Sequence, residues 1–281
     1  MKVLVTGING QLGYDVVKVL EKRGIECIGA RRKEFDITNE KDTKKFIHGY
    51  NPDAVIHCAA YTAVDKAEDD EELCRSVNCD GTRAIAEICK EIGAKMIYIS
   101  TDYVFPGEGE KAYEINDATG PLGIYGKTKL EGENAVKKIL EKYFIVRISW
   151  VFGKNGNNFI KTMLRIGKDR AEVNVVADQI GSPTYTADLA EFLCDLIETE
   201  KYGVYHATNE GYCTWADLAE ETFRLVGYST KVNRITTSEY PVKAKRPLNS
   251  RMSKQSIDDA GLNRLPNWKN ALIRYLNELE Y

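Results

Sequence analysis

Short apolar runs alternate with longer amphipathic stretches through the first 150 residues of the chain. The short runs are rich in Val and Ile and end at Gly or polar residues, which is typical of buried strands. The longer stretches repeat apolar residues at helical spacing. The predicted strands cover 2–7, 25–30, 52–60, 95–100 and 144–149, and the predicted helices cover 11–24, 39–50, 71–93 and 125–142. This alternation predicts βαβ units with right-handed crossovers, and therefore a parallel sheet covered by helices on both faces.

The pattern changes after Trp150, where strand, turn and helix signals become mixed. A capping box at Thr214 and Asp217 and a stop at Gly227 delimit one clear helix in this part. The other expected features are a loop over 151–158, mixed strand and turn over 173–186, a helix over 187–198, a strand over 203–208, and short elements with a final amphipathic helix over 228–281. We expect the helix and strand spanning about 187–208 to return to the main sheet.

The composition is that of an ordinary globular protein, with 43% apolar and 29% charged residues in a chain of 281. This length suits one large domain or two closely joined ones. The formal net charge is −3, so no basic field indicates a nucleic-acid partner. The densest run of charge, residues 68–72, is interpreted as a solvated helix face.

The cysteines, histidines and apolar runs bear on metal binding, on the redox compartment and on membrane insertion. The seven cysteines form no Cys-x-x-Cys pair and the three histidines are widely separated, so we expect no metal site of the zinc type. Scattered thiols in apolar surroundings are typical of a reducing compartment. No apolar run approaches the ~18 residues of a membrane span, and the chain begins directly with a strand. We expect a cytoplasmic protein without a membrane partner.

Three glycines, Gly7, Gly10 and Gly13, follow the first predicted strand and open the first predicted helix. Such a triad allows a tight turn, close approach of the backbone to a pyrophosphate, and close packing of helix on strand. The helix start offers free N–H groups to phosphates. A plain glycine-rich turn is the alternative, but the position in the first βα turn favours a dinucleotide. We therefore expect an α/β, Rossmann-type doubly wound parallel sheet, with residues 1–152 as the dinucleotide-binding domain and 153–281 mainly as a smaller substrate-binding lobe.

The end of the second strand carries Arg31, Arg32 and Lys33, where NAD-preferring folds usually have an acidic residue. A basic cluster at this point favours the 2′-phosphate of NADP, since guanidinium groups bind phosphates well. A solvated basic loop is the equally weighted alternative. Just beyond it, Asp36 and Ile37 are placed to border the adenine.

Tyr125 and Lys129 are four residues apart at the start of a predicted helix, so their side chains share one face. A free Tyr has a pKa of about 10 and donates protons poorly at neutral pH. A neighbouring ammonium favours the phenolate and lowers that pKa. The pair is therefore interpreted as a general acid for a carbonyl with its tuning cation, which could also bind a ribose. Packing of an aromatic residue at a helix start is the alternative.

A predicted strand that ends with Ser100, Thr101 and Asp102 favours the catalytic interpretation of Tyr125 and Lys129. In open α/β sheets the ligand crevice lies at the carboxyl ends of the strands, where a hydroxyl can bind a carbonyl oxygen. The order of glycine loop, Thr101, Tyr125 and Lys129 resembles the short-chain dehydrogenase/reductase superfamily in its extended branch. The segment "VNCDGT" is similar to the helix of that superfamily that bears a structural Asn, here Asn78.

Several longer stretches together, among them "AAYTAVDKAE", "STDYVFPG", "YGKTKLEGE", "DQIGSPTYTADLA" and "RPLNSRM", resemble the dTDP-4-dehydrorhamnose reductase family over nearly the whole chain. This resemblance implies NAD(P)H-dependent reduction of the 4-keto group of dTDP-4-dehydro-L-rhamnose, the last step of dTDP-L-rhamnose synthesis. Tyr125 would be the acid, Lys129 its tuner and ribose ligand, and Thr101 the ligand of the carbonyl oxygen. The residues that the resemblance assigns to the cofactor are Gln11, Leu12, Gly13, Asp36, Ile37, Ala60, Tyr61, Thr62, Tyr125 and Lys129.

For the nucleotide-sugar, the resemblance implies contacts from Thr101, Asp102 and Trp150. Arg246 and Arg251 flank "PLNS" and could clamp a pyrophosphate, with a solvated basic loop as the alternative. His57 and Cys58, at the end of the third strand, are interpreted as core or crevice wall.

Other functions on the same scaffold stay open at this point. A nucleotide-sugar dehydratase or 4-epimerase is the nearest enzyme alternative, and a non-catalytic cofactor-binding regulatory subunit is the second, because fold does not imply catalysis. The choice between NADH and NADPH also stays open. The resemblance further allows a homodimer bridged by Mg²⁺, to which Asp15, Glu278 and Glu280 could contribute.

Overall fold

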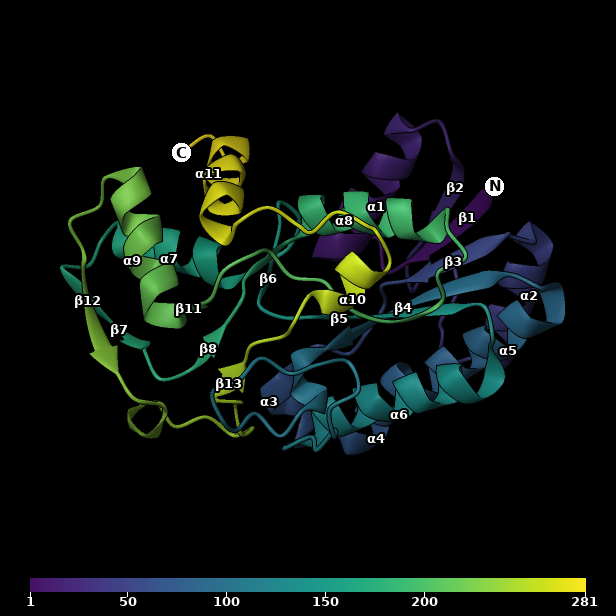
Figure 1. Ribbon diagram of the computed structural model, residues 1–281, viewed down its shortest axis with the longest axis horizontal. Helices are drawn as coiled ribbons and strands as arrows, with labels where there is room; N and C mark the ends of the chain where they lie inside the picture. Colours follow the sequence, from purple (N-terminus) through teal and green to yellow (C-terminus); the bar gives the residue numbers. More distant parts are fainter.

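A computed structural model describes residues 1–281 and has at its centre a sheet of six strands (Figure 1). All neighbouring pairs are parallel, in the order β10-β5-β4-β3-β1-β2. The strands are β1 (Lys2–Thr6), β2 (Glu26–Ala30), β3 (Ala54–His57), β4 (Lys95–Thr101), β5 (Tyr143–Ile148) and β10 (Gly203–His206). The predicted parallel sheet is confirmed, including the return of β10 to its edge beside β5. The chain runs from β1 to β2 on one side and from there to β3 on the other, so the strand order reverses at β1.

Helices cover both faces of this sheet because its strands are apolar on both sides (Figure 1). Val3 and Val5 of β1 belong to a buried cluster with α1 (Gln11–Lys22) and α8 (Thr186–Ile197). Leu4, between them, belongs to the cluster on the opposite face. That face is covered by α2 (Glu40–Tyr50), α5 (Thr82–Ile92) and α6 (Ile124–Ile139). The two clusters hold the strand ends in fixed positions, and these strand ends form the site described below.

The long helix predicted over 71–93 is interrupted, which corrects the sequence interpretation. It consists of α4 (Glu71–Arg75), a π-helical turn (Ser76–Gly81) and α5, after a short α3 (Val64–Ala67). Buried Asn78 lies in the π turn, and its side chain bonds the backbone N–H and C=O of Tyr61 at 2.8 and 3.2 Å. A π turn widens the helix locally and is common at functional sites. Here it brings an amide side chain to the loop that follows β3.

The C-terminal elements gather mostly beyond the carboxyl ends of the sheet strands (Figure 1). Small sheets pair β6 with β9, β7 with β12, and β8 with β11 and β13. Their bounds are β6 (Val151–Phe152), β7 (Glu172–Val176), β8 (Ile180–Gly181), β9 (Thr184–Tyr185), β11 (Cys213–Thr214), β12 (Lys231–Ile235) and β13 (Asn249–Ser250), with helices α7 (Phe159–Gly167), α9 (Trp215–Val226), α10 (Gln255–Asp259) and α11 (Trp268–Glu278). Helix α7 has no counterpart among the elements expected from sequence.

Local signals account for the ends of several helices. The capping box predicted for α9 is present, with Thr214 Oγ1 accepting from Asp217 N and Asp217 returning a bond to Thr214 N, and Gly227 ends the helix at φ 74°. Asn39 caps α2 through a bond from Asp42 N. The final amphipathic helix is α11. The structure contains no helix that is both long and apolar enough to cross a membrane.

Candidate active site

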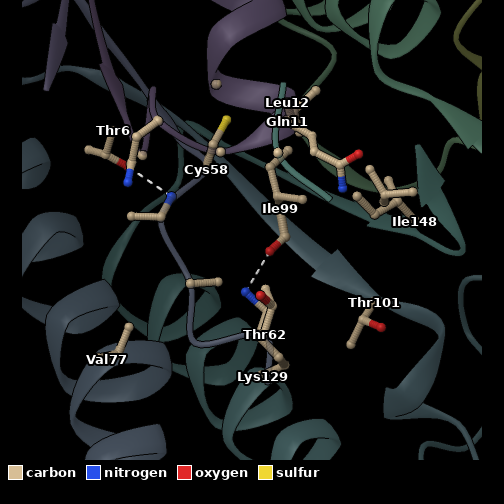
Figure 2. A pocket seen from close by; sticks show the side chains of 18 of the residues that line it. Thr6, Gln11, Leu12, Cys58, Thr62, Val77, Ile99, Thr101, Lys129 and Ile148 are labelled. Carbon is tan, nitrogen blue, oxygen red and sulfur yellow. Dashed lines mark hydrogen bonds between the residues drawn. The ribbon is translucent and has the colours of Figure 1, made fainter. Parts of the chain in front are cut away.

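One cavity of about 620 Å³ opens at the carboxyl ends of β1, β3, β4 and β5, where the strand order reverses (Figure 2). This is the position at which open α/β sheets bind ligands. The predicted site residues that line it are Gly7, Gly10, Gln11, Leu12, Gly13, Arg31, Asp36, Ile37, Ala60, Thr62, Thr101, Asp102, Tyr125, Lys129 and Trp150. The fold therefore brings together in one hollow residues that lie more than a hundred positions apart in the chain.

The glycine loop forms the floor of the cavity beneath the start of α1. Gly7 has φ 72°, and a Cβ there would lie 2.8 Å from the backbone of Ala59, at the end of β3. A Cβ on Gly13 would lie 2.6 Å from the Gly7 carbonyl oxygen. Gly10 precedes α1 without any side-chain cap, so the first N–H groups of this twelve-residue helix remain available. The loop thus fits a pyrophosphate, which free N–H groups at a helix start attract.

A buried histidine supports this floor from behind. Thr6 Oγ1 accepts from Ala59 N at 3.1 Å and lies 2.8 Å from His57 Nδ1. The other ring nitrogen of His57 lies 3.2 Å from Thr82 Oγ1, whose proton is donated to a backbone carbonyl. Burial lowers the pKa of His57 to about 3, so the ring is neutral and accepts at Nδ1. His57 therefore belongs to the core, and burial raises the pKa of its neighbour Cys58, in the cavity wall, to about 12.

The basic residues after β2 lie at the cavity edge but are paired with acids. Arg31 Nη2 lies 3.0 Å from Glu34, and Arg32 Nε donates to Asp36 at 2.8 Å. Asp36 also accepts from the backbone and hydroxyl of Thr38. The cluster is therefore less positive than its sequence indicates, although Arg31 and Arg32 both line the cavity.

Tyr125 and Lys129 lie on one face of α6, as predicted. Figure 2 shows Lys129 reaching the end of β4, where Nζ donates to the Ile99 carbonyl oxygen at 2.7 Å. Burial lowers the pKa of Lys129 to about 7, and burial raises the pKa of Tyr125. The shift of Tyr125 is opposite to the direction expected from its neighbour, because desolvation penalises the phenolate more than the surrounding groups stabilise it.

Thr101 and Asp102 form a buried hydrogen-bonded unit beside Tyr125. Thr101 Oγ1 donates to Asp102 Oδ1 at 2.9 Å and accepts from Tyr103 N at 3.2 Å. Tyr125 lies beside this unit: its ring packs edge-on against that of Tyr103, with centroids 5.5 Å apart, and Thr101 opposes the rise in the pKa of its phenol. Burial raises the pKa of Asp102 to about 6, against the opposing effect of hydrogen bonds from Ser250 and Thr101. The residues proposed to meet a carbonyl are thus already in mutual contact.

Trp150 closes the cavity on the side of the C-terminal elements. Its backbone has φ 49°, a left-handed conformation that is unusual for a bulky residue. The indole stacks on Trp215 with ring centroids 3.8 Å apart, and Trp215 Nε1 donates to Gln179 Oε1 at 3.1 Å. Strain of this kind clusters at ligand sites, which fits a substrate-facing aromatic residue.

Three predicted site residues do not line the cavity. Tyr61 lies beside it, with its backbone held by Asn78. Arg246 contacts Asp65 at 2.5 Å and the hydroxyl of Tyr103 at 3.2 Å, so it lies next to a residue of the cavity wall. Arg251 Nη1 donates to the Glu110 carbonyl oxygen, because the backbone around it pairs with the loop after β4. Both arginines thus have protein partners, and the pyrophosphate clamp expected of them stays a prediction.

Sequence reasoning missed part of the wall, namely Tyr103, Val77 and the loop residues Gly156 and Asn157. That loop contacts the glycine loop, since Asn155 donates to the Asn9 carbonyl oxygen and Asn158 to Gln11 Oε1. The sequence feature that could have indicated this part of the wall is the run of Asn and Gly residues after the predicted strand 144–149.

The acids considered for a metal are engaged elsewhere. Asp15 accepts from Thr186 Oγ1 at 2.5 Å, and Glu278 accepts from the Tyr185 hydroxyl at 2.7 Å. The chain contains no group of three or more His, Cys, Asp or Glu side chains that could hold a metal ion. Nothing therefore supports the Mg²⁺ that the resemblance allowed.

Comparison with known proteins agrees with this geometry. The family model described as the RmlD substrate binding domain matches residues 1–281. A dTDP-4-dehydrorhamnose reductase of Streptomyces griseus is 42% identical over 276 residues, covering 96% of this chain and 91% of that protein. The crystal structure of a dTDP-4-dehydrorhamnose reductase from Clostridium acetobutylicum is similar with a TM-score of 0.98, at 43% identity and full coverage of both chains. That of the Bacillus anthracis enzyme in complex with NADP has a TM-score of 0.96, at 42% identity over 99% of both chains.

Proposed function

The chain belongs to the dTDP-4-dehydrorhamnose reductase family, and from that premise we propose that it uses NAD(P)H to reduce the 4-keto group of dTDP-4-dehydro-L-rhamnose, giving dTDP-L-rhamnose. The observation that carries the proposal is the meeting of Thr101, Tyr125 and Lys129 in one cavity with the glycine loop. A binding subunit without catalysis has no need of this acid and its neighbouring amine.

The cofactor would lie along the floor of the cavity. Gly7, Gly10 and Gly13 leave room for a pyrophosphate at the start of α1, and Ala60, Thr62 and Asp36 line the same hollow. When bound, the nicotinamide supplies hydride to the carbonyl carbon. Arg31 and Arg32 at the edge favour a 2′-phosphate, in line with the NADP bound by the Bacillus anthracis relative. We therefore propose NADPH as the preferred cofactor and NADH as an alternative.

The proton comes from this chain's own residues. Tyr125 donates its phenolic proton to the carbonyl oxygen, and Thr101 binds the same oxygen by turning its hydroxyl proton away from Asp102. Lys129, with a pKa of about 7, titrates close to neutral pH and so can bring positive charge into the cavity in which the phenolate develops. Its amine also lies in the cavity where a nicotinamide ribose would be bound. Trp150 and Asp102 face the sugar.

The residue after Asp102 separates this proposal from a dehydratase. Removing a proton from C5 of the sugar requires a base. The superfamily resemblance implies that dehydratases place this base, a Glu, directly after the Thr-Asp pair. Here that position is Tyr103, and burial raises the pKa of its phenol to about 12. A phenol with that pKa is a poor base at neutral pH, so the cavity suits reduction better than dehydration.

The test mixes the purified protein with NADPH and dTDP-4-dehydro-L-rhamnose and follows the reduced nicotinamide band. We expect one NADPH oxidised for each sugar reduced, and no deuterium at C5 of product formed in D₂O. Conversion of dTDP-glucose to a 4-keto-6-deoxy sugar without net cofactor consumption would instead identify a dehydratase. Binding of NADPH without turnover of any 4-keto sugar nucleotide would identify a regulatory subunit.

A further inference from the structure

Ser250 of β13 reaches from the C-terminal part of the chain to the wall of the candidate site. Its Oγ donates to Asp102 Oδ2 at 2.5 Å, on the side of the carboxylate opposite to the bond from Thr101. The exposed fractions of Ser250, Asp102 and Thr101 are 3%, 3% and 4%. Water therefore has almost no access to these bonds, and the loss of one donor is not readily replaced from solvent.

Backbone pairing holds Ser250 in this position. Asn249 N donates to the Gly107 carbonyl oxygen at 2.9 Å, and Asn249 Nδ2 donates to that of Lys111 at 2.8 Å. On the other side, Tyr113 N donates to the Arg251 carbonyl oxygen at 2.9 Å. The residues before and after Ser250 are thus fixed to the loop that follows β4, so its hydroxyl cannot easily turn elsewhere.

The bond to Asp102 affects the acid through Thr101. A hydroxyl has one proton and two acceptor lone pairs. In this structure Thr101 donates its proton to Asp102, and it is also close enough to the Tyr125 phenol to oppose the rise in the pKa of that group. Ser250 therefore stands at the far end of a chain of contacts that passes through Asp102 and Thr101 to Tyr125.

We propose that Ser250 is a positioning residue for the reduction: it orients the Asp102 carboxylate and stabilises its charge, so that the Thr101 hydroxyl is held beside Tyr125 until its proton turns to the carbonyl oxygen of the substrate. This proposal rests on the proposed function. It also implies that activity requires residues 249–251 to keep their hydrogen bonds to the loop that follows β4.

No charged side chain competes with Ser250 for Asp102. From α6, Lys129 donates to the Ile99 carbonyl oxygen, and Tyr125 lies beside Thr101. From the C-terminal part, Arg246 is paired with Asp65 and with the hydroxyl of Tyr103, the residue after Asp102. Two hydroxyl donors and neighbouring backbone N–H groups therefore stabilise the carboxylate. Removing one donor disfavours the charged form and must raise the pKa of Asp102 further.

The experiment compares the full-length wild type with Ser250→Ala, the near-isosteric Ser250→Cys, and Ser182→Ala as a matched control. Ser182 is equally buried, but its hydroxyl donates to the Gly211 carbonyl oxygen. We expect Ser250→Ala to lower kcat about tenfold, as loss of one hydrogen bond to a charged group does. The acid limb of the pH profile should move upward, while the Kd for NADPH stays unchanged. Ser250→Cys should show the same shift, and Ser182→Ala neither effect.

A second readout does not depend on activity. Carboxyl ¹³C NMR of aspartate-labelled protein, with Asp102→Asn to assign the signal, should show Asp102 titrating at higher pH in both Ser250 variants. Unchanged titration in a folded variant would overturn the proposal, as would a full Ser250→Ala effect on kcat in the Asp102→Asn background. If the wild type reduces no sugar, the proposed function fails, while the titration still decides whether Ser250 controls Asp102.

Discussion

At the scale of single residues, the site depends on groups whose burial changes their chemistry. Lys129 is almost fully enclosed, which brings its pKa to about 7, and burial raises the pKa of Tyr125. A phenol with a raised pKa donates its proton less readily at neutral pH, so the proposed donation by Tyr125 depends on positive charge that Lys129 can bring into the cavity. The proposed roles of Tyr125 and Lys129 therefore depend on the burial of their side chains as much as on their spacing in the sequence.

Replacing Tyr125 by Phe should lower kcat by about 10²-fold or more, because a general acid typically contributes that much. The Kd for NADPH should stay close to the wild-type value, since the phenol is not expected to be its main contact. Stopped-flow turnover and fluorescence titration measure the two quantities separately. A Phe variant with nearly unchanged kcat would exclude Tyr125 as the acid.

Replacing Arg31 and Arg32 together by Ala should raise the KM for NADPH by about tenfold, the effect of losing hydrogen bonds to a charged group. The KM for NADH should change little, because NADH lacks the 2′-phosphate. Lys33→Ala is the matched control, since Lys33 belongs to the same basic run but does not line the cavity. Equal effects on both cofactors, or none, would mean that the loop is merely solvated.

At the scale of elements, the π turn before α5 connects two walls of the site. Asn78 bonds the backbone of Tyr61 in the loop after β3, and its amide also donates to Thr128 Oγ1 on α6 at 3.2 Å. Thr128 lies between Tyr125 and Lys129 in the sequence. One buried side chain therefore holds the proposed cofactor loop and the proposed catalytic helix at a fixed separation.

Replacing Asn78 by Ala should destabilise the fold by about 1–3 kcal/mol, the cost of leaving buried polar groups without partners. It should also raise the KM for the cofactor several-fold, because the 59–62 loop loses its support. Asn267→Ala is the control, since it removes the N-cap of α11, worth about 1 kcal/mol, and Asn267 does not line the cavity. Urea unfolding and steady-state kinetics measure the two effects, and an unchanged KM for Asn78→Ala would separate this residue from the site.

At the scale of the whole molecule, buried polar groups join the sheet to the C-terminal part of the chain. Arg147 of β5 makes paired bonds of 2.8 Å to Glu133 of α6, and its Nη1 lies 3.4 Å from His206 Nε2. His206 Nδ1 lies 3.1 Å from the Ser253 carbonyl oxygen. Burial lowers the pKa of His206 to about 3, the same value as for His57.

These two histidines should make stability fall in mild acid. The unfolded chain binds a proton on each below about pH 6.5, whereas the folded chain does not until about pH 3, so stability is lost as the pH falls through this window. At pH 5 the loss is about 2 kcal/mol for each histidine. Protonation of folded Asp102, whose raised pKa is about 6, opposes this by about 1 kcal/mol.

We therefore expect the free energy of unfolding in urea to be about 3 kcal/mol lower at pH 5 than at pH 7. In His206→Gln the difference between the two pH values should shrink to about 1 kcal/mol, because one titrating group is gone. A pH dependence that is the same in both proteins would show that His206 is not held neutral by the fold.

The sequence by itself determined the features that depend on neighbouring residues. Apolar periodicity predicted the parallel sheet and most of its helices, and the glycine spacing predicted the loop below the cavity, because turns, caps and amphipathic faces are set within a few positions. The spacing of Tyr125 and Lys129 placed them on one face of α6 for the same reason. Helix α7 was missed although Asn158 at the end of the preceding loop is a good N-cap residue and accepts from Lys161 N.

Only the tertiary structure decided the features that depend on burial and on distant segments. Desolvation sets the protonation of Lys129 and Tyr125, and it can be read only once every surrounding group is in place. The pairing of Arg251 with the loop after β4 likewise joins segments about 140 positions apart. The bond between Ser250 and Asp102 spans 148 positions of the chain. No local pattern encodes such a contact, because it arises from how the completed elements pack.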